Sequence, residues 1–512
     1  MILQEFNKSF GMQKKLIFHN SAELYKRECI QSAKAGVPSV NCEGWYLLAF
    51  ARTMLKDYKI GKGESFEEVD YATQMGIMLA CVLDLVRKKK LTYFKESMID
   101  NGTVRRLLLD IETIRLDGKL LSIKDSSNAK LSDVYIIAEA YIERLDKLNL
   151  YDSIKIIKEA SVLFSDGSLD NEVEIIGIYT DTLNDYFVLE MELWNAITKE
   201  KEIQNIDICT AEINQTAEKQ FFRVFGLNNE IHAVIKDIVS REIPWEQVQI
   251  ISSSSANFYP LITYLQKLEI PYCVPEGISE RYSYAASHIN TYLNNPANFT
   301  IDSYGNVKTS EVFEGLANRL ERLAENSKLP QPSVLAILNK VSICRKSITY
   351  YDFEANYHVV MKMIEGILLN GNCSEDNKEE GAIYVSSLQN TEVGFRPYLY
   401  LIGFESRNYP GDSAQSPILL DDEMRNIGLP EHALSHKHRD DLENRIKRIL
   451  ASNSKLQTIS YVSYDTVNMR EQNPSAFYQK ELKDSGCNEV LFGFVEDDES
   501  RILEAREWLL KK

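Results

Sequence analysis

The sequence lacks an apolar segment long enough to cross a lipid bilayer. The most apolar run, residues 75–83, is about half of the roughly 20 residues that a transmembrane helix requires. Residues 1–15 are polar and lack the apolar core of a secretory signal. The eight cysteines lie far apart with no C-x-x-C pair, which favours reduced thiols over a disulfide framework. We therefore expect a cytoplasmic protein with no membrane partner.

Positive charge is also scarce. The chain has 58 Lys and Arg residues against 75 Asp and Glu residues, for a formal net charge of −17. This balance excludes a protein that is basic throughout and coats nucleic acid. It does not exclude a basic groove on one face, because binding depends on the local field. With 44% hydrophobic residues, the composition is that of a globular protein with room for several domains.

Helical periodicity dominates the first part of the chain. Residues 21–160 repeatedly place apolar side chains on one helical face, and proline is nearly absent there. Short β-like runs lie between and beside these helices, at 15–18, 173–176 and 206–209.

Two later blocks alternate strands with helices. The first predicts a helix, a strand, a helix and a strand over 229–239, 248–251, 259–268 and 271–274. A helical stretch over 285–375 follows, and the polar segment 370–380 predicts a loop. The second block predicts strands and one helix, in the order 382–385, 398–403, 439–451 (helix) and 457–462. Strand–helix–strand order predicts parallel sheets buried on both faces, and hence an α/β fold.

Three segments carry a more specific pattern. The first is the strand 175–178 followed by Tyr-Thr-Asp-Thr, and the second is 243–251 followed by Ile-Pro-Tyr at 270–272. The third is a long succession of short motifs: Gln389, Gly394-Phe395-Arg396-Pro397, the strand 400–404, Asn408-Tyr409-Pro410-Gly411, 417–425 and Asn473-Pro474-Ser475-Ala476-Phe477. Chance explains a match to one such motif more readily than a match to all of them in this order.

The succession resembles the UvrD-like helicase architecture, in which two RecA-like parallel β/α cores carry large helical insertions. More narrowly it is similar to the AddB-type (RexB-like) subunit of bacterial helicase–nucleases and to related PD-(D/E)XK nuclease family proteins. The resemblance covers most of the chain at low similarity. It implies a degenerate first core with a helical insertion (1–227), the start of a second core (228–284), a helical insertion (285–375), the remainder of the second core (376–470) and a C-terminal tail leading toward an absent nuclease domain (471–512).

The parts that such a fold needs to hydrolyse ATP are missing. In active members of this family a strand ends in Asp-Glu, and these carboxylates hold Mg²⁺ and polarise water. This sequence has Gly177 and Ile178 at the two positions. No GxxxxGK[ST] phosphate loop exists, and the nearest lookalike, 61–65, has Glu64 where the lysine would stand. The segment 445–453, which matches the arginine-finger motif, lacks the family's Thr-Arg-Ala. We therefore predict no catalytic residue, no nucleotide site and no cofactor in this chain.

A metal site is not predicted either. A PD-(D/E)XK nuclease needs acids and an x-Lys partner on adjacent strands, and the acidic run 496–499 offers neither strand pair nor lysine. Cys487 alone cannot hold the iron–sulfur cluster of some AddB-type subunits. His432, His436 and His438 are partly spaced like metal ligands, but their charged surroundings favour a polar turn.

We therefore expect a non-motor, helicase-like subunit that binds DNA and scaffolds a partner helicase–nuclease subunit in DNA repair, recombination or foreign-DNA processing. The family pattern makes Gln389, Arg396 and Arg425 the candidate contacts with DNA or the partner, although polar groups at strand ends serve equally often to tie loops together. Two alternatives stand beside this expectation. One is an active hydrolase of the PD-(D/E)XK nuclease/helicase family whose catalytic domain lies outside this chain, and the other is a pure protein-interaction module, which the net charge favours.

Overall fold

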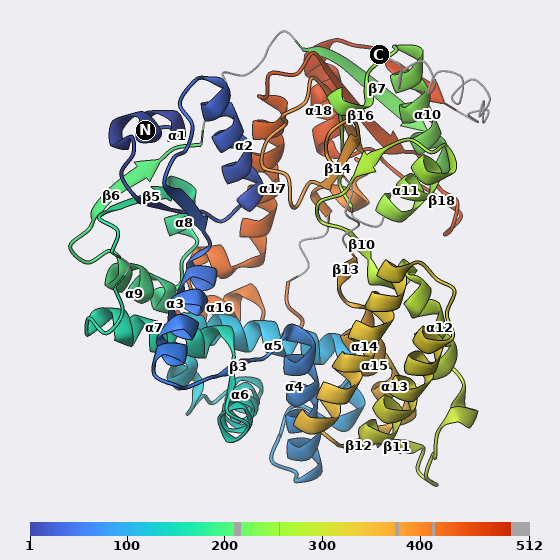
Figure 1. Cartoon of the computed structure of the whole chain (residues 1–512). Helices are drawn as coiled ribbons and strands as arrows, with labels where there is room; N and C mark the ends of the chain where they lie inside the picture. Colours follow the sequence, from blue (N-terminus) through green and yellow to red (C-terminus); the bar gives the residue numbers. More distant parts are fainter. Residues whose placement is uncertain (171, 209–216, 255–256, 374–377, 412–414, 493–512) are drawn as a thin grey trace.

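The computed structural model describes residues 1–512 except 171, 209–216, 255–256, 374–377, 412–414 and 493–512 (Figure 1). Within these ranges the chain is an α/β protein with a four-stranded and a seven-stranded parallel sheet and many helices. Cys209 and the acidic run at 496–499 lie outside the described residues, and the other seven cysteines are free. No helix in the described ranges is both long and apolar enough to cross a membrane.

The four-stranded sheet forms a layer between two groups of helices. Its parallel strands run in the order β2 (Cys42–Trp45), β1 (Lys15–Phe18), β5 (Ile175–Tyr179) and β6 (Glu202–Ile206). Because successive side chains point to opposite faces, Ile17 packs on one side and Phe18 on the other. One face is covered by α1 (Leu3–Phe10) and α2 (Ala22–Lys34), the other by α3 (Leu47–Gly61), α7 (Ser153–Ser165) and α9 (Val188–Ile197).

The seven-stranded sheet has the same layered construction. Its parallel strands run in the order β19 (Glu489–Phe492), β7 (Glu218–Val224), β16 (Leu456–Val462), β15 (Tyr398–Ile402), β8 (Val248–Ser252), β14 (Ile383–Ser387) and β9 (Tyr272–Cys273). Helices α10 (Leu227–Ser240) and α11 (Phe258–Lys267) cover one face, and α17 (Ser435–Leu450) and α18 (Ala476–Ser485) cover the other. The later strands predicted from the sequence are all present in this sheet, as β8, β9, β14, β15 and β16.

The seven-stranded sheet contains two strands that were not predicted from the sequence. Strand β7 lies within the range 1–227 assigned to the first core, but it pairs along its whole length with β16. Strand β19 lies within the expected tail 471–512 and pairs with β7. Both therefore belong to the seven-stranded sheet, and the boundary between the two sheets falls before Glu218. Strand β7 escaped prediction because charged and polar residues surround its short apolar run Phe221-Phe222.

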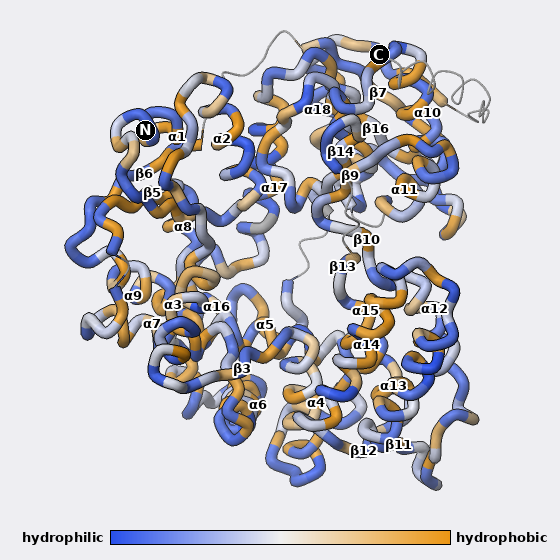
Figure 2. Tube along the Cα trace, in the orientation of Figure 1, coloured by the Kyte–Doolittle hydropathy of each residue, from blue (hydrophilic) through white to orange (hydrophobic). Residues whose placement is uncertain are grey.

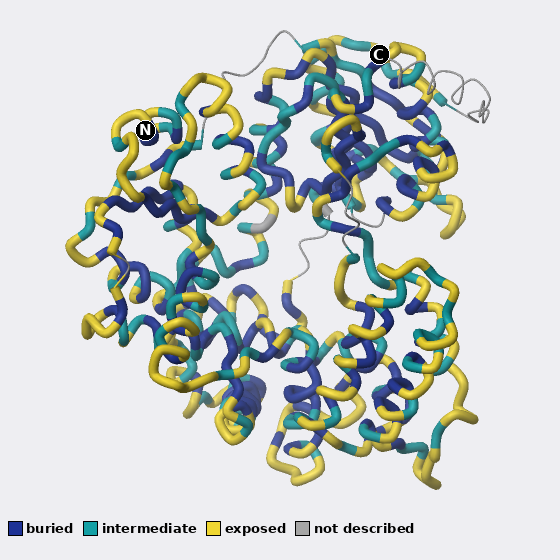
Figure 3. The backbone as a smooth tube through the Cα atoms, viewed as in Figure 1, coloured by how far each residue is buried: buried dark blue, intermediate teal, exposed yellow. Residues whose placement is uncertain are grey.

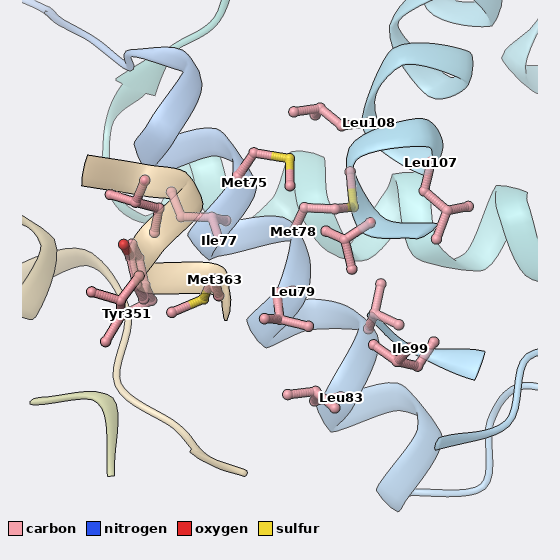
Figure 4. Close-up of a cluster of buried hydrophobic side chains, with 14 of the residues drawn as sticks. Met75, Ile77, Met78, Leu79, Leu83, Ile99, Leu107, Leu108, Tyr351 and Met363 are labelled. Carbon is pink, nitrogen blue, oxygen red and sulfur yellow. The ribbon is translucent and has the colours of Figure 1, made fainter. Parts of the chain in front are cut away.

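The remaining large helices form a third body below the two sheets in Figure 1. It contains α4 (Tyr71–Arg87), α5 (Asn101–Leu116), α6 (Ala129–Lys147), α12 (Tyr284–Leu293), α13 (Thr309–Glu325), α14 (Gln331–Tyr350), α15 (Tyr357–Leu369) and α16 (Asp421–Ile427). The sequence predicted two helical insertions, whereas the structure packs both around one hydrophobic core. Figure 4 shows Met75, Ile77 and Leu79 of α4 gathered with Tyr351 and Met363 from the later stretch. Figure 2 shows the apolar residues along α14 and α15.

Short two-stranded ladders lie outside the two large sheets. They are β3 (Glu67–Glu68) with β4 (Leu150–Tyr151), β10 (Ile278–Ser279) with β13 (Asn372–Cys373), β11 (Asn306–Lys308) with β12 (Glu354–Asn356) and β17 (Tyr464–Asp465) with β18 (Arg470–Glu471). Figure 3 shows buried residues concentrated in the two large sheets and between the helices, with exposed residues in the connections. The ladder of β10 and β13 marks where the chain leaves the seven-stranded sheet for the helical body and where it returns.

The shared helical core predicts a large effect at Gly76. A Cβ there would lie 2.1 Å from the Tyr351 ring, which is only 1% exposed and cannot move aside. Overpacking a core costs about 1–3 kcal/mol, which exceeds the gain of up to about 1 kcal/mol in helix propensity. We expect Gly76→Ala to lower the calorimetric unfolding temperature. The matched control is Gly61→Ala in α3, where a Cβ meets open space, and an equal loss in both variants would contradict the shared core.

Candidate site between the two parallel sheets

The two sheets point their carboxyl ends at a common cavity of about 350 Å³. Residues that follow β1 and β2 line it from one side, and residues that end or follow β9 and β14 line it from the other. Ligands of open parallel sheets bind at the carboxyl ends of the strands, so this is the place where the fold would hold a ligand. Its lining includes three carboxylates, from Glu23, Glu276 and Glu392.

The start of α2 does not offer a phosphate cradle. A phosphate at a helix N-terminus binds free backbone amides, assisted by the positive end of the helix dipole. Here the Ala22 amide donates to the Tyr46 hydroxyl at 2.9 Å, and the Leu24 amide donates to the Ser21 side chain at 3.2 Å. Glu23 places a carboxylate in the same first turn. The first turn is therefore already capped and carries negative charge.

Gly177 and Ile178 serve packing. The two residues point to opposite faces of β5, and Ile178 is fully buried. A Cβ on Gly177 would lie 2.7 Å from Ile206 and 3.1 Å from Phe6, so glycine permits the close approach of α1 to the sheet. Neither position can hold a cation, and the strand end is filled by core side chains.

The arginines of α17 are engaged by one buried carboxylate. Glu392 receives an ion pair from Arg445 at 3.0 Å and a second, shorter one from Arg448. Arg445 also donates to the Gln389 carbonyl, and Arg448 lies 3.8 Å from Asp181, which follows β5 in the other sheet. The segment 445–453, which the sequence resemblance compared with an arginine finger, therefore fastens α17 to its surroundings, and both Arg445 and Arg448 are already paired.

A second set of charges joins the two sheets through α2. The buried Arg27 guanidinium lies 2.5 Å from Glu379, and Lys26 lies 3.1 Å from the same carboxylate. The Arg27 guanidinium also sits 3.6 Å from the centre of the Phe395 ring. Burial opposes ionisation of Glu379, but the hydrogen bond from Arg27 prevails and lowers its pKa. We call Arg27, Glu379 and Phe395 the inter-sheet clamp.

The three residues predicted to contact DNA or a partner lie in different surroundings. The Gln389 side chain is exposed at the rim of the cavity. Arg396 is 7% exposed and donates to the backbone carbonyls of Val248 at 2.8 Å and Ala382 at 2.5 Å. Its position favours the structural alternative, in which it ties strand ends together. Arg425 is exposed on α16 in the helical body and pairs with Asp422 at 3.1 Å, so the structure does not bring the three residues together.

Two of the three histidines at 432–438 have described surroundings, and the side chain of His438 lies outside the described residues. His432 packs edge-on against the Phe187 ring, and burial lowers its pKa. His436 lies 3.4 Å from Glu431. Across the described ranges, no group of three or more His, Cys, Asp or Glu side chains is placed to hold a metal ion.

Sequence reasoning missed a buried carboxyl pair in the seven-stranded sheet. Glu230 of α10 is fully buried and accepts hydrogen bonds from the Gly403 amide at 3.0 Å and the Ser460 hydroxyl at 2.6 Å. Burial, and then the charge of Glu405, raise the pKa of Glu230 to about 8. The sequence carried a signal for this: Glu230 stands four residues before Val234, on the apolar stripe of its helix. No sequence signal pointed to the inter-sheet clamp, because its ion pair joins residues that are distant in the sequence.

Two sequence comparisons give no relative for this chain. No protein-family model matches the chain, and no curated protein sequence matches it. The two parallel sheets and their shared cavity therefore have to be interpreted from their own geometry.

The inter-sheet clamp predicts unequal effects for adjacent cations. Arg27→Ala removes a buried cation with a charged hydrogen bond worth about 1.5–3 kcal/mol, whereas the exposed Lys26 contributes at most about 1 kcal/mol. We expect Arg27→Ala to speed hydrogen–deuterium exchange in both α2 and β14, and Lys26→Ala to leave it nearly unchanged. Equal exchange in the two variants would show that Arg27 does not hold the sheets together.

Glu230 predicts a pH-dependent stability. Its folded pKa of about 8 lies above the ordinary value of 4.5, so the folded state binds the proton more tightly than the unfolded state. Its contribution is therefore complete below about pH 4.5 and is lost as the pH rises through 8. We expect Glu230→Gln to flatten the decline in unfolding temperature between these values, whereas Gln at the exposed Glu246 should not change the profile. A Glu230→Gln profile that parallels the wild type would refute the assignment.

Proposed function

We propose that the chain is a non-motor, helicase-like scaffold that binds DNA and supports a partner helicase–nuclease subunit. In this proposal the four-stranded and seven-stranded sheets are two RecA-like cores of a UvrD-like architecture, and the helical body combines the insertions of both. The observation that carries the proposal is the pair of parallel sheets with their carboxyl ends at one cavity, each interrupted by long helical excursions. The motif order from Gln389 to Phe477 adds the AddB-type resemblance.

The non-motor part of the proposal rests on the chemistry of the cavity. Of its charged lining residues, Glu23 is paired with Arg27 and Glu392 with Arg445, so the arginine in its walls is already engaged and is not free to meet the phosphates of a nucleotide. The amides at the start of α2 are taken, and Arg445 and Arg448 are paired. The clamp between Arg27 and Glu379 further opposes the opening and closing of two cores that a motor cycle requires.

The scaffolding part follows from how the bodies are joined. One hydrophobic core joins the helical excursions of both sheets, and ion pairs such as Arg27 with Glu379 join the sheets themselves. This fixed relation suits a protein that presents surfaces to a partner and to a DNA strand. Exposed groups at the cavity rim, such as Gln389, remain candidates for those contacts.

Single-stranded DNA binding across a salt series tests the proposal. We expect binding at low salt that weakens as log affinity falls linearly with log salt, the slope counting the phosphates neutralised. Absence of binding at the lowest salt would leave the protein-interaction module as the better function. Mg²⁺-dependent turnover of ATP above a no-enzyme control would contradict the non-motor part and favour the alternative hydrolase.

A further inference from the structure

A strip of exposed tyrosines runs from the seven-stranded sheet to the helical body. Tyr259 in the first turn of α11 is 41% exposed, Tyr282 is 51% exposed, and Tyr284 at the start of α12 is 47% exposed. The rings of Tyr259 and Tyr282 are stacked, with centroids 4.0 Å apart and planes 9° apart. We call these residues the tyrosine strip. In Figure 1 it follows the path from α11 past β10 to α12.

The backbone beneath the strip is anchored on both sides. Glu280, at the start of the 3₁₀ turn that contains Tyr282, pairs with Lys340 of α14 at 2.5 Å, and its amide donates to the Gly371 carbonyl at 2.9 Å. Ser283 then caps α12 by accepting from the Ala286 amide at 3.2 Å. The backbone that carries Tyr282 and Tyr284 is therefore ordered before any ligand arrives, which lowers the entropic cost of binding.

The strip borders a cavity of about 290 Å³, close to the smallest ligand pockets of proteins. Tyr259 and Tyr264 line it together with His232, whose ring stacks on Tyr264 at 4.2 Å. Exposed polar groups of Asn228 and Thr263 stand at its edge. The cavity thus offers aromatic faces beside hydrogen-bonding groups, the combination that a nucleobase uses.

The charge near the strip does not oppose a phosphate backbone. Arg281, directly before Tyr282, is exposed and forms no ion pair or hydrogen bond with any described residue. Lys236 is exposed one helical turn after His232 on α10, again without an ion pair among the described residues. The nearest carboxylate in the turn, Glu280, is neutralised by Lys340.

We propose that the tyrosine strip is a stacking platform for single-stranded nucleic acid. Bases stack on the outer faces of the Tyr259–Tyr282 pair and on Tyr284, one base enters the adjoining cavity, and Arg281 meets the phosphate backbone. Stacking on aromatic rings tolerates any base, so the platform holds a strand without reading its sequence. This inference rests on the proposed DNA-binding function and assigns it a surface away from the inter-sheet cavity.

Fluorescence anisotropy with a labelled oligothymidine tests the platform in the full-length chain. We expect Tyr259→Ala and Tyr282→Ala each to weaken binding by about tenfold, since one stacked base is worth about 1–3 kcal/mol. Tyr259→Phe and Tyr282→Phe keep the ring faces and should retain wild-type affinity. Tyr304→Ala is the matched control, because Tyr304 is 84% exposed and lies outside the strip.

The outcomes separate this inference from the function beneath it. If the wild-type chain binds no oligonucleotide, the proposed DNA-binding function fails and the platform fails with it. If the wild type binds and both alanine variants bind equally well, the platform alone is overturned. Weakening in the phenylalanine variants as severe as in the alanine variants would overturn stacking as the mechanism, because only the hydroxyl differs.

Discussion

Burial of apolar surface between helices from distant parts of the chain is the interaction on which the rest of the structure depends. Residues from 69–150, 285–369 and 418–434 contribute to one hydrophobic core. The first group interrupts the four-stranded sheet, and the others interrupt the seven-stranded sheet. Neither excursion alone encloses this core, so each requires the other, and their association brings the two sheets into a fixed relation.

The contact between the sheets follows from that relation. With the helical body joining them at one end, α2 and α17 meet across the carboxyl edges, and Arg27 and Arg448 find carboxylates on the opposite side. Ion pairs are worth more when partly desolvated, because solvent screens them less. Arg445, on the same helix as Arg448, lines the inter-sheet cavity and is paired with Glu392. The fixed relation between the sheets and the pairing of the charges at the cavity are thus two consequences of one packing arrangement.

The sequence allowed the α/β class and the parallel strands of the second sheet to be predicted, because buried parallel strands are short apolar runs that need no partner to be recognised. Strand β7 was missed because its pairing with β16, and not its own composition, makes it a strand. Arg396 illustrates the same limit at the site: its family position suggested a ligand contact, yet three-dimensional packing surrounds its guanidinium with backbone carbonyls. A local sequence pattern is enough to identify a helix or a strand. The role of a polar side chain such as Arg396 depends instead on how the folded structure buries it.

The acidity of the chain bears on how it would hold DNA. Charged side chains of the inter-sheet cavity are paired with one another, as Glu392 is with Arg445, whereas the tyrosine strip is aromatic and Glu280 in its turn is paired with Lys340. The salt dependence of binding scales with the number of phosphates that the protein neutralises, whereas stacking on aromatic faces adds affinity without neutralising phosphates. A protein with a net charge of −17 that binds through stacking would therefore show a shallow salt slope. The net charge therefore restricts how the protein can bind DNA more than whether it can bind DNA.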